Sequence, residues 1–211
     1  MNPTSAMARL RHYHRRHGMH GTLQRIKVAF QRAASTGQMA LYSCDLPVTG
    51  APAPLGSLER KRNYAALGTE EANRIASHWN SEAMQKIIVE RFAANAELWL
   101  LRLDANLAAY GWTLRGKSIE PHFFPIQPQD VHLFDFFVFP EFRGRHLNPS
   151  LIWQILDQVG REGLKRAFIE AAVWNRPQLS SLAKTPFKKV GVARKFCLGK
   201  STLILWSHSK K

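Results

Sequence analysis

Several features that would assign a chain to a special class are missing from these 211 residues. No run of about 18 apolar residues occurs, so the sequence predicts no membrane-spanning helix. The two cysteines, Cys44 and Cys197, are too few for a disulfide framework or a cysteine zinc site, and we expect a reducing, cytoplasmic environment. Acidic residues are scarce, because 15 Asp and Glu stand against 30 Lys and Arg. The net charge of +15 attracts phosphate groups, whether in nucleic acid, an anionic membrane or a nucleotide-bearing cofactor.

The remaining composition is typical of a globular domain. Hydrophobic residues make up 45% of the chain and charged residues 21%, which excludes wholesale disorder, collagen and coiled coil. The length predicts one domain with an appendage. We assign residues 1–46 to a basic N-terminal extension, residues 47–57 to a linker rich in proline and glycine, and residues 58–211 to the main domain.

The first 35 residues hold seven Arg and Lys, four His and no acid. No apolar segment of the kind found in signal peptides follows them. Leu23, Ile26, Phe30 and Ala33 recur at helical spacing, which predicts a basic amphipathic helix over residues 22–34. Its apolar side either docks on the main domain or contacts an anionic membrane or acidic partner. The membrane alternative would place the protein peripherally at the inner membrane face.

The sequence of the main domain predicts a mixed α/β sheet, with elements along the chain in the order β, α, α, β, β, β, α, β, α, β, β. We expect an edge strand from residue 58, helices over 69–78 and 82–94 capped by Thr69 and Ser81, and a hairpin over 97–114. A strand over 132–139, a helix capped by Asn148 and a strand over 166–173 form a crossover unit. A helical stretch that opens at Pro177 and a closing hairpin around residues 199–200 follow, and residues 39–44 add a short strand before the linker.

The most informative segment runs from Phe137 to Pro149, where a buried strand gives way to a basic, glycine-containing loop and then to a helix. A helix N-terminus offers unpaired N–H groups and the positive end of a dipole. Arg143 and Arg145 add full charges. This combination predicts a site for a diphosphate, although an ordinary turn with surface arginines would have the same pattern.

The segment resembles the acyl-CoA signature of the GNAT acyltransferase superfamily, and the element order is the one that fold uses. The resemblance covers about residues 58–206, and Asn175 with the helical stretch ending at 187–192 resembles the family's second motif. It implies a GNAT-like, mixed, mostly antiparallel central sheet flanked by helices. It also implies that acetyl-CoA is bound by Phe137, Val138, Phe139, Arg143, Gly144, Arg145, His146, Leu147, Asn148 and Asn175.

Three positions depart from the family's pattern. His146 and Asn148 stand where the loop usually has glycines, so the His146 side chain crowds the site, whereas Asn148 is a good helix cap. Phe187 stands at the comparable place of the tyrosine that protonates the leaving thiolate. We therefore expect the thiolate to leave by way of water.

The catalytic candidates are carboxylates in apolar strands. The resemblance implies that the strand ending at Val138 splays from the 168–173 strand and that the thioester lies between them. Attack by an amine needs a base, and burial raises the pKa of a carboxyl group, which suits Asp135 or Glu170. Each is otherwise a structural acid paired with arginine or backbone. His122 and His132 precede the same strand and are candidates for acceptor contacts, or else surface or core histidines.

We expect an acyl-CoA-dependent N-acyltransferase, with no metal, that acts on a small amine acceptor. The positive charge favours an anionic acceptor, such as an amino sugar of surface-polysaccharide synthesis in a bacterium. Two alternatives come from other classes: a nucleic-acid-binding protein, and a catalytically degenerate GNAT fold that binds a partner or membrane. Against nucleic acid, the sequence has no helix-turn-helix, RNP-like or zinc-finger motif. A homodimer is left open.

Overall fold

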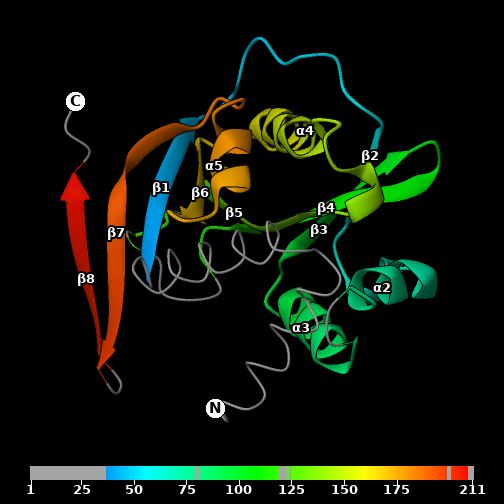
Figure 1. Cartoon of the computed structure of the whole chain (residues 1–211), viewed down its shortest axis with the longest axis horizontal. Coiled ribbons are helices and arrows are strands. Elements are labelled where there is room, and N and C mark those ends of the chain that lie inside the picture. Colours follow the sequence, from blue (N-terminus) through cyan, green and yellow to red (C-terminus); the bar gives the residue numbers. More distant parts are fainter. Residues whose placement is uncertain (1–36, 79–80, 119–122, 124, 199–200, 209–211) are drawn as a thin grey trace, which may run out of the picture.

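The computed structural model describes residues 37–208 apart from 79–80, 119–122, 124 and 199–200. An eight-stranded sheet has the order β2–β3–β4–β5–β6–β1–β7–β8 (Figure 1). Neighbouring strands are antiparallel except β5 and β6, which are parallel. The strands are β1 (Gln38–Asp45), β2 (Ser57–Lys61), β3 (Glu97–Leu103), β4 (Asn106–Arg115), β5 (Asp130–Val138), β6 (Arg166–Ala172), β7 (Lys188–Leu198) and β8 (Ser201–His208).

Helices cover both faces of this sheet. Helices α4 (Leu147–Arg161) and α5 (Arg176–Leu182) lie on one face, and α2 (Thr69–Ala76) and α3 (Ser81–Ala93) lie on the other (Figure 1). Short 3-10 turns occupy Tyr64–Ala66 and Pro140–Phe142. Within the described residues, none of the helices is both long enough and apolar enough to cross a bilayer.

The element order predicted after residue 58 is confirmed, and three local expectations are corrected. Gly68, not Thr69, is the N-cap of α2, and its N–H donates to the Glu71 side chain at 2.9 Å. His146, not Asn148, is the N-cap of α4. The stretch after Pro177 is helical only to Leu182, because Pro186 interrupts it and the chain then continues as β7.

β1 shows how chain order and sheet order differ. The sequence analysis placed this strand in the N-terminal extension, before the proline-rich linker. In the sheet it lies between β6 and β7, with Leu41 opposite both Glu170 and Gly191. The segment before the linker therefore supplies an inner strand of the sheet, whereas residues 1–36 and the predicted helix over 22–34 lie outside the described residues.

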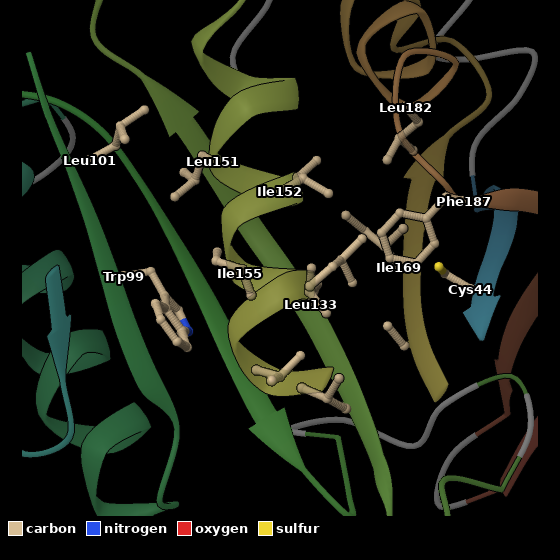
Figure 2. Packing of buried hydrophobic residues seen from close by; sticks show 14 of the residues in the cluster. Cys44, Trp99, Leu101, Leu133, Leu151, Ile152, Ile155, Ile169, Leu182 and Phe187 are labelled. Atoms are coloured by element: carbon tan, nitrogen blue, oxygen red, sulfur yellow. The ribbon is translucent and has the colours of Figure 1, made fainter. Parts of the chain in front are cut away.

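The larger of the two main apolar clusters lies on the side of the sheet that α4 covers. Leu151, Ile152 and Ile155 of α4 are fully buried against Leu133 of β5 and Ile169 of β6 (Figure 2). The opposite cluster is built from Ile75 of α2, Ile88 of α3 and the inner residues of β3 and β4, including Leu98, Leu100, Tyr110 and Trp112. Burial of apolar surface on both faces fixes which side each strand residue occupies.

An ion-pair network holds the C-terminal end of α4 to the sheet. Glu162, the C-cap of α4, lies 2.8 Å from Arg60 of β2 and also binds Arg115 of β4. Burial alone would raise the pKa of the Glu162 carboxyl, but hydrogen bonds from both arginines outweigh it and lower that pKa from 4.5 to about 2. The charged form of Glu162 therefore stabilises the fold.

We predict that Glu162→Gln lowers the free energy of unfolding at pH 7 by about 1–2 kcal/mol. Because the pKa of Glu162 is lower in the folded state, its contribution is complete above about pH 4.5 and disappears as the pH falls towards 2. Urea unfolding at several pH values should therefore show the two proteins converging in acid. Glu90→Gln on α3, an exposed residue, is the control; equal effects of the two substitutions would contradict the network's role.

Candidate active site

The site is built around a split in the sheet between β5 and β6. The two strands pair over four positions, from Asp130 opposite Arg166 to Leu133 opposite Ile169. At the closed end, Asp130 is buried and accepts two hydrogen bonds of 2.9 Å from the Arg166 guanidinium. Beyond Leu133 the strands no longer pair, so the backbone of β5 that faces β6 is left without strand hydrogen bonds.

A bulge in β5 ends the regular pairing on its other side too. Asp135 has a left-handed backbone with φ of 51°, and the register against β4 shifts between Tyr110 and Trp112. Gly111 lies opposite the bulge, where a Cβ atom would come within 2.5 Å of the Phe136 ring. The extra residue reverses the alternation of β5, so Phe136 and Val138 face the α4 side.

On that side, a cleft of about 560 Å³ lies between the end of β5, the start of α4 and α5. Phe136, Phe137 and Val138 form its apolar wall. Its remaining lining comes from the loop before α4 and from α5, and includes Phe142, Arg143, Gly144, His146, Leu147, Asn148, Pro149, Asn175, Pro177, Gln178, Ser180, Ser181 and Lys184. The cleft is large enough for an extended ligand that follows the open edge of β5.

The N-terminus of α4 opens onto this cleft. The first N–H groups of a helix, here those of Leu147 and Asn148, have no partner within the helix. His146 holds the turn in a left-handed conformation with φ of 57°, the region that glycine adopts freely and other residues adopt at a cost. This conformation explains why the related loops have glycine at this place, and His146 meets the same backbone demand with a side chain present.

Two cations lie at the start of α4. Arg143 donates from Nε to the Val138 carbonyl at 3.3 Å, and its guanidinium lies 5.7 Å from the centre of the Phe137 ring. Lys184, which follows α5, places Nζ 3.1 Å from Nδ1 of His146. Arg143 and Lys184 bring positive charge to the amides at the helix N-terminus, an arrangement that favours a phosphate ligand.

Asn148 joins α4 to α5 rather than capping α4. Its Nδ2 donates to Gln178 Oε1 at 3.0 Å and to Ser181 Oγ at 2.8 Å. Its Oδ1 is buried and has no hydrogen-bond partner among the described residues. Asn148 Oδ1 could accept a hydrogen bond from a ligand in the cleft. A ligand that carries a hydroxyl or amide N–H donor as well as phosphate would satisfy it.

On the opposite face of the sheet, a histidine and a carboxylate meet where the split begins. His132 Nε2 lies 2.8 Å from Glu170 Oε2, and the His132 side chain is only 7% exposed. Glu170 is the first residue of β6 beyond the pairing with β5. The pair therefore lies where the split begins, on the face away from α4.

Asp135 differs from what the sequence suggested. It was expected to be buried in an apolar strand, but the bulge leaves its side chain 33% exposed. Its carboxylate lies 2.5 Å from Nη1 of Arg91 on α3, and that guanidinium also covers the Trp112 ring at 5.2 Å. Asp135 thus occurs as a paired acid, the alternative given above, and its role as base stays a prediction.

The other candidates fall in different places. Phe139 is fully buried and its N–H donates to the Ala108 carbonyl, so it lies outside the cleft lining. Arg145 is exposed and stacks over Phe142. Phe187, placed by resemblance at the tyrosine position, is buried in the α4-side cluster and does not line the cleft. His122 lies outside the described residues.

Sequence reasoning missed the contribution of α5 and the residue that follows it. Gln178, Ser181 and Lys184 all line the cleft. The spacing of three residues between Gln178 and Ser181 places them on one side of α5, and that periodicity was the available signal, whereas Lys184 follows the helix. Arg91, the partner of Asp135, carried no signal because the two residues are 44 positions apart.

Cys44 is excluded as a nucleophile. Burial, reinforced by the neighbouring Asp45 charge and only partly opposed by Lys188, raises the pKa of its thiol to about 11. The thiol is therefore protonated near neutral pH, and it packs with the α4-side cluster (Figure 2).

We predict that His146→Gly is more stable than His146→Ala by about 1 kcal/mol. Both substitutions remove the contact with Lys184, so the difference isolates the left-handed backbone at residue 146. Thermal and urea unfolding of the two variants measure it. Equal stability of the two would mean that the left-handed turn does not constrain this position.

The comparisons with known proteins agree with this geometry. The family model described as the acetyltransferase (GNAT) family matches residues 63–183, more than half of the chain. Among curated proteins, no match was found.

Similar solved structures share the fold at low identity. A GNAT-family acetyltransferase from Colwellia psychrerythraea has a TM-score of 0.56 and 11% identity, over 82% of this chain and 57% of that one. A tandem GNAT protein from the clavulanic acid biosynthesis pathway has a TM-score of 0.55 and 20% identity, over 76% and 55%. A glucosamine N-acetyltransferase region of a fungal multi-domain β-N-acetylglucosaminidase has a TM-score of 0.51 and 10% identity, over 80% and 22%.

The chain therefore spans between about a fifth and three fifths of the length of these three proteins. Their likeness concerns the fold, whereas the family match concerns the sequence itself and covers the split strands, the basic loop and α5. On that match, the chain belongs to the GNAT family of acetyltransferases.

Proposed function

We propose that the protein transfers an acyl group, most simply acetyl, from coenzyme A to the amine of a small acceptor. The observation that carries this proposal is the cleft itself. It joins the open edge of β5 to a helix N-terminus surrounded by Arg143, His146 and Lys184. Its apolar wall on β5 and the cations at the start of α4 suit a donor with an apolar arm and a diphosphate.

The residues present fit coenzyme A. The amides of Leu147 and Asn148 and the charges of Arg143 and Lys184 would hold its diphosphate. The unpaired backbone of β5 near Phe137 and Val138 would hydrogen-bond its amide-containing arm, as the family resemblance implies. When bound, the donor supplies an acyl group that is already activated as a thioester.

The acceptor is best placed on the opposite face, where Glu170 and His132 lie. An amine is protonated near neutral pH and must lose a proton before it attacks a thioester. Glu170 is 20% exposed and hydrogen-bonded to His132, so its carboxylate is accessible and held in one orientation. We assign Glu170 as the base, directly or through a water, and His132 as the residue that positions it.

The local charges bear on the acceptor. The net charge of the chain suggested an anionic acceptor, but this face carries Glu170 beside His132, and Asp135 in its pair with Arg91. Carboxylates attract the ammonium form of an amine. An amino sugar satisfies this requirement, and the glucosamine N-acetyltransferase region among the similar structures is compatible with it at the level of fold.

We predict that Arg143→Ala weakens acetyl-CoA binding by about ten- to a hundredfold, because a charge-assisted phosphate contact contributes about 1.5–3 kcal/mol. Calorimetric titration measures the dissociation constant. Arg161→Ala, at the opposite end of α4, removes the same charge away from the cleft and is the control. The assignment of the cleft fails if the two variants bind acetyl-CoA with the same affinity.

We predict that Glu170→Gln lowers the acyl-transfer rate by about 10²–10⁴ and removes the rise of the rate with pH that a base produces. Asp135→Asn should keep that rise, because Asp135 is held by Arg91. The pH–rate profiles of the two variants, measured with a panel of amines including amino sugars, test the assignment. If Asp135→Asn loses the rise and Glu170→Gln keeps it, the roles are reversed.

A further inference from the structure

The positive charge of the chain comes from its two ends. Residues 1–44 contain seven Lys and Arg and no acid, and residues 171–211 contain nine and no acid. Residues 45–170 hold 14 Lys and Arg against all 15 acids, so this central part is close to neutral. The net charge of +15 is therefore not spread over the molecule.

The fold brings the two acid-free ends together. β1, from the N-terminal end, pairs with β7 from the C-terminal end, and Gln38 lies opposite Arg194. Residues 1–36, which contain all seven cations of the N-terminal end, precede β1 in the sequence. Figure 1 shows β7 and β8 at one side of the sheet, beyond the part that α4 and α5 cover.

Apolar side chains are exposed at this same end. Leu203 and Leu205 of β8 are 50% and 53% exposed, and Val190 of β7 and Trp206 of β8 are exposed as well. Cross-strand pairs share a face, so Leu205 lies beside Arg194 and Leu203 beside Phe196. Trp206 lies opposite the buried Ala193 and so faces the other way, and we call Leu203, Leu205, Arg194 and Phe196, together with the exposed Lys189, the β7–β8 surface.

The two edges of the sheet differ in kind. β2, at the other edge, has five residues and includes Glu59, Arg60 and Lys61, and charges of this kind protect an edge from association. β8 has eight residues and none of them is Asp, Glu, Lys or Arg. β8 thus presents exposed apolar side chains beside the cations of β7. This combination is complementary to a surface that has negative charge outside and an apolar interior.

We propose that the β7–β8 surface docks the protein on an anionic lipid bilayer. The cations of β7 would contact lipid phosphates, and Leu203 and Leu205 would enter the acyl-chain boundary. The half-exposed leucines favour lipid over nucleic acid, because nucleic-acid surfaces are bound through cations and stacked aromatic rings. The proposal gives β7 and β8 a surface role that the sequence offered as one of two alternatives for residues 1–35.

Such docking is compatible with the acyl-transfer site. The cleft is lined by β5, α4 and α5 with the residue that follows it, and β6 and β1 separate β5 from β7 in the sheet. A bilayer against β8 would therefore leave the donor cleft open. The proposal is independent of the proposed reaction, since none of its residues lines the cleft.

The test is co-sedimentation of the full chain with vesicles of phosphatidylcholine containing 30% phosphatidylglycerol, and with pure phosphatidylcholine. We expect binding to the anionic vesicles only. Leu203→Ser/Leu205→Ser should reduce the partition coefficient about tenfold. Lys189→Gln/Arg194→Gln should reduce it about fivefold per charge removed. Val89→Ser and Lys86→Gln are the controls, because they remove an exposed apolar residue and an exposed cation from α3, away from the β7–β8 surface. Neither substitution should change the partition coefficient.

The leucine variant should keep the melting temperature and the acetyl-CoA affinity of the wild-type chain, which would show that it is folded. Hydrogen exchange of the wild-type chain is a second measurement that needs no variant: residues 201–208 should exchange more slowly with anionic vesicles, whereas α3 should not change. Wild-type binding that survives in the leucine variant would assign docking to another segment and overturn the proposal. So would leucine-dependent self-association without vesicle binding, or salt-sensitive oligonucleotide binding without vesicle binding.

Discussion

The short parallel pairing between β5 and β6 is the constraint on which the rest of the molecule depends. It extends over four residue pairs, with the buried Asp130–Arg166 pair at one end and the bulge at Asp135 just beyond the other. A longer pairing would close the sheet and leave no backbone for a ligand. Because it stops at Leu133, the α4 side gains a cleft and the opposite side gains an accessible Glu170.

Much of this arrangement could be predicted from the sequence because its signals are local. Alternating apolar residues and turns predicted the order of elements, and the strand, basic loop and helix around residues 137–149 predicted the cleft's cationic end. These features depend on residues within a few positions of one another. The replacement of a family glycine by His146 was also visible in the sequence, because it is a change at a single position of the loop. The structure adds that this residue has a left-handed backbone.

What could not be predicted depends on contacts between distant residues. The Arg91–Asp135 pair places a carboxylate that was expected to be buried in a partly exposed ion pair, and its members lie on different elements. The bulge that turns Phe136 towards α4 needs Gly111 on the neighbouring strand. The position of β1 between β6 and β7 arises from pairing with strands more than 100 residues away, which periodicity within β1 cannot specify.

The split also separates charge by sign, and this changes what the net charge means. Arg143 and Lys184 lie at the cleft, whereas Glu170 lies on the other face, where Asp135 is paired with Arg91. An anionic donor and a cationic amine would therefore each meet the opposite charge, and would approach from different faces. The excess of +15 arises at the two acid-free chain ends, and among their described cations Lys184 alone lines the cleft. Net charge is thus a poor guide to the acceptor here, because the field at the reacting groups is set by the few charges within about a Debye length of them.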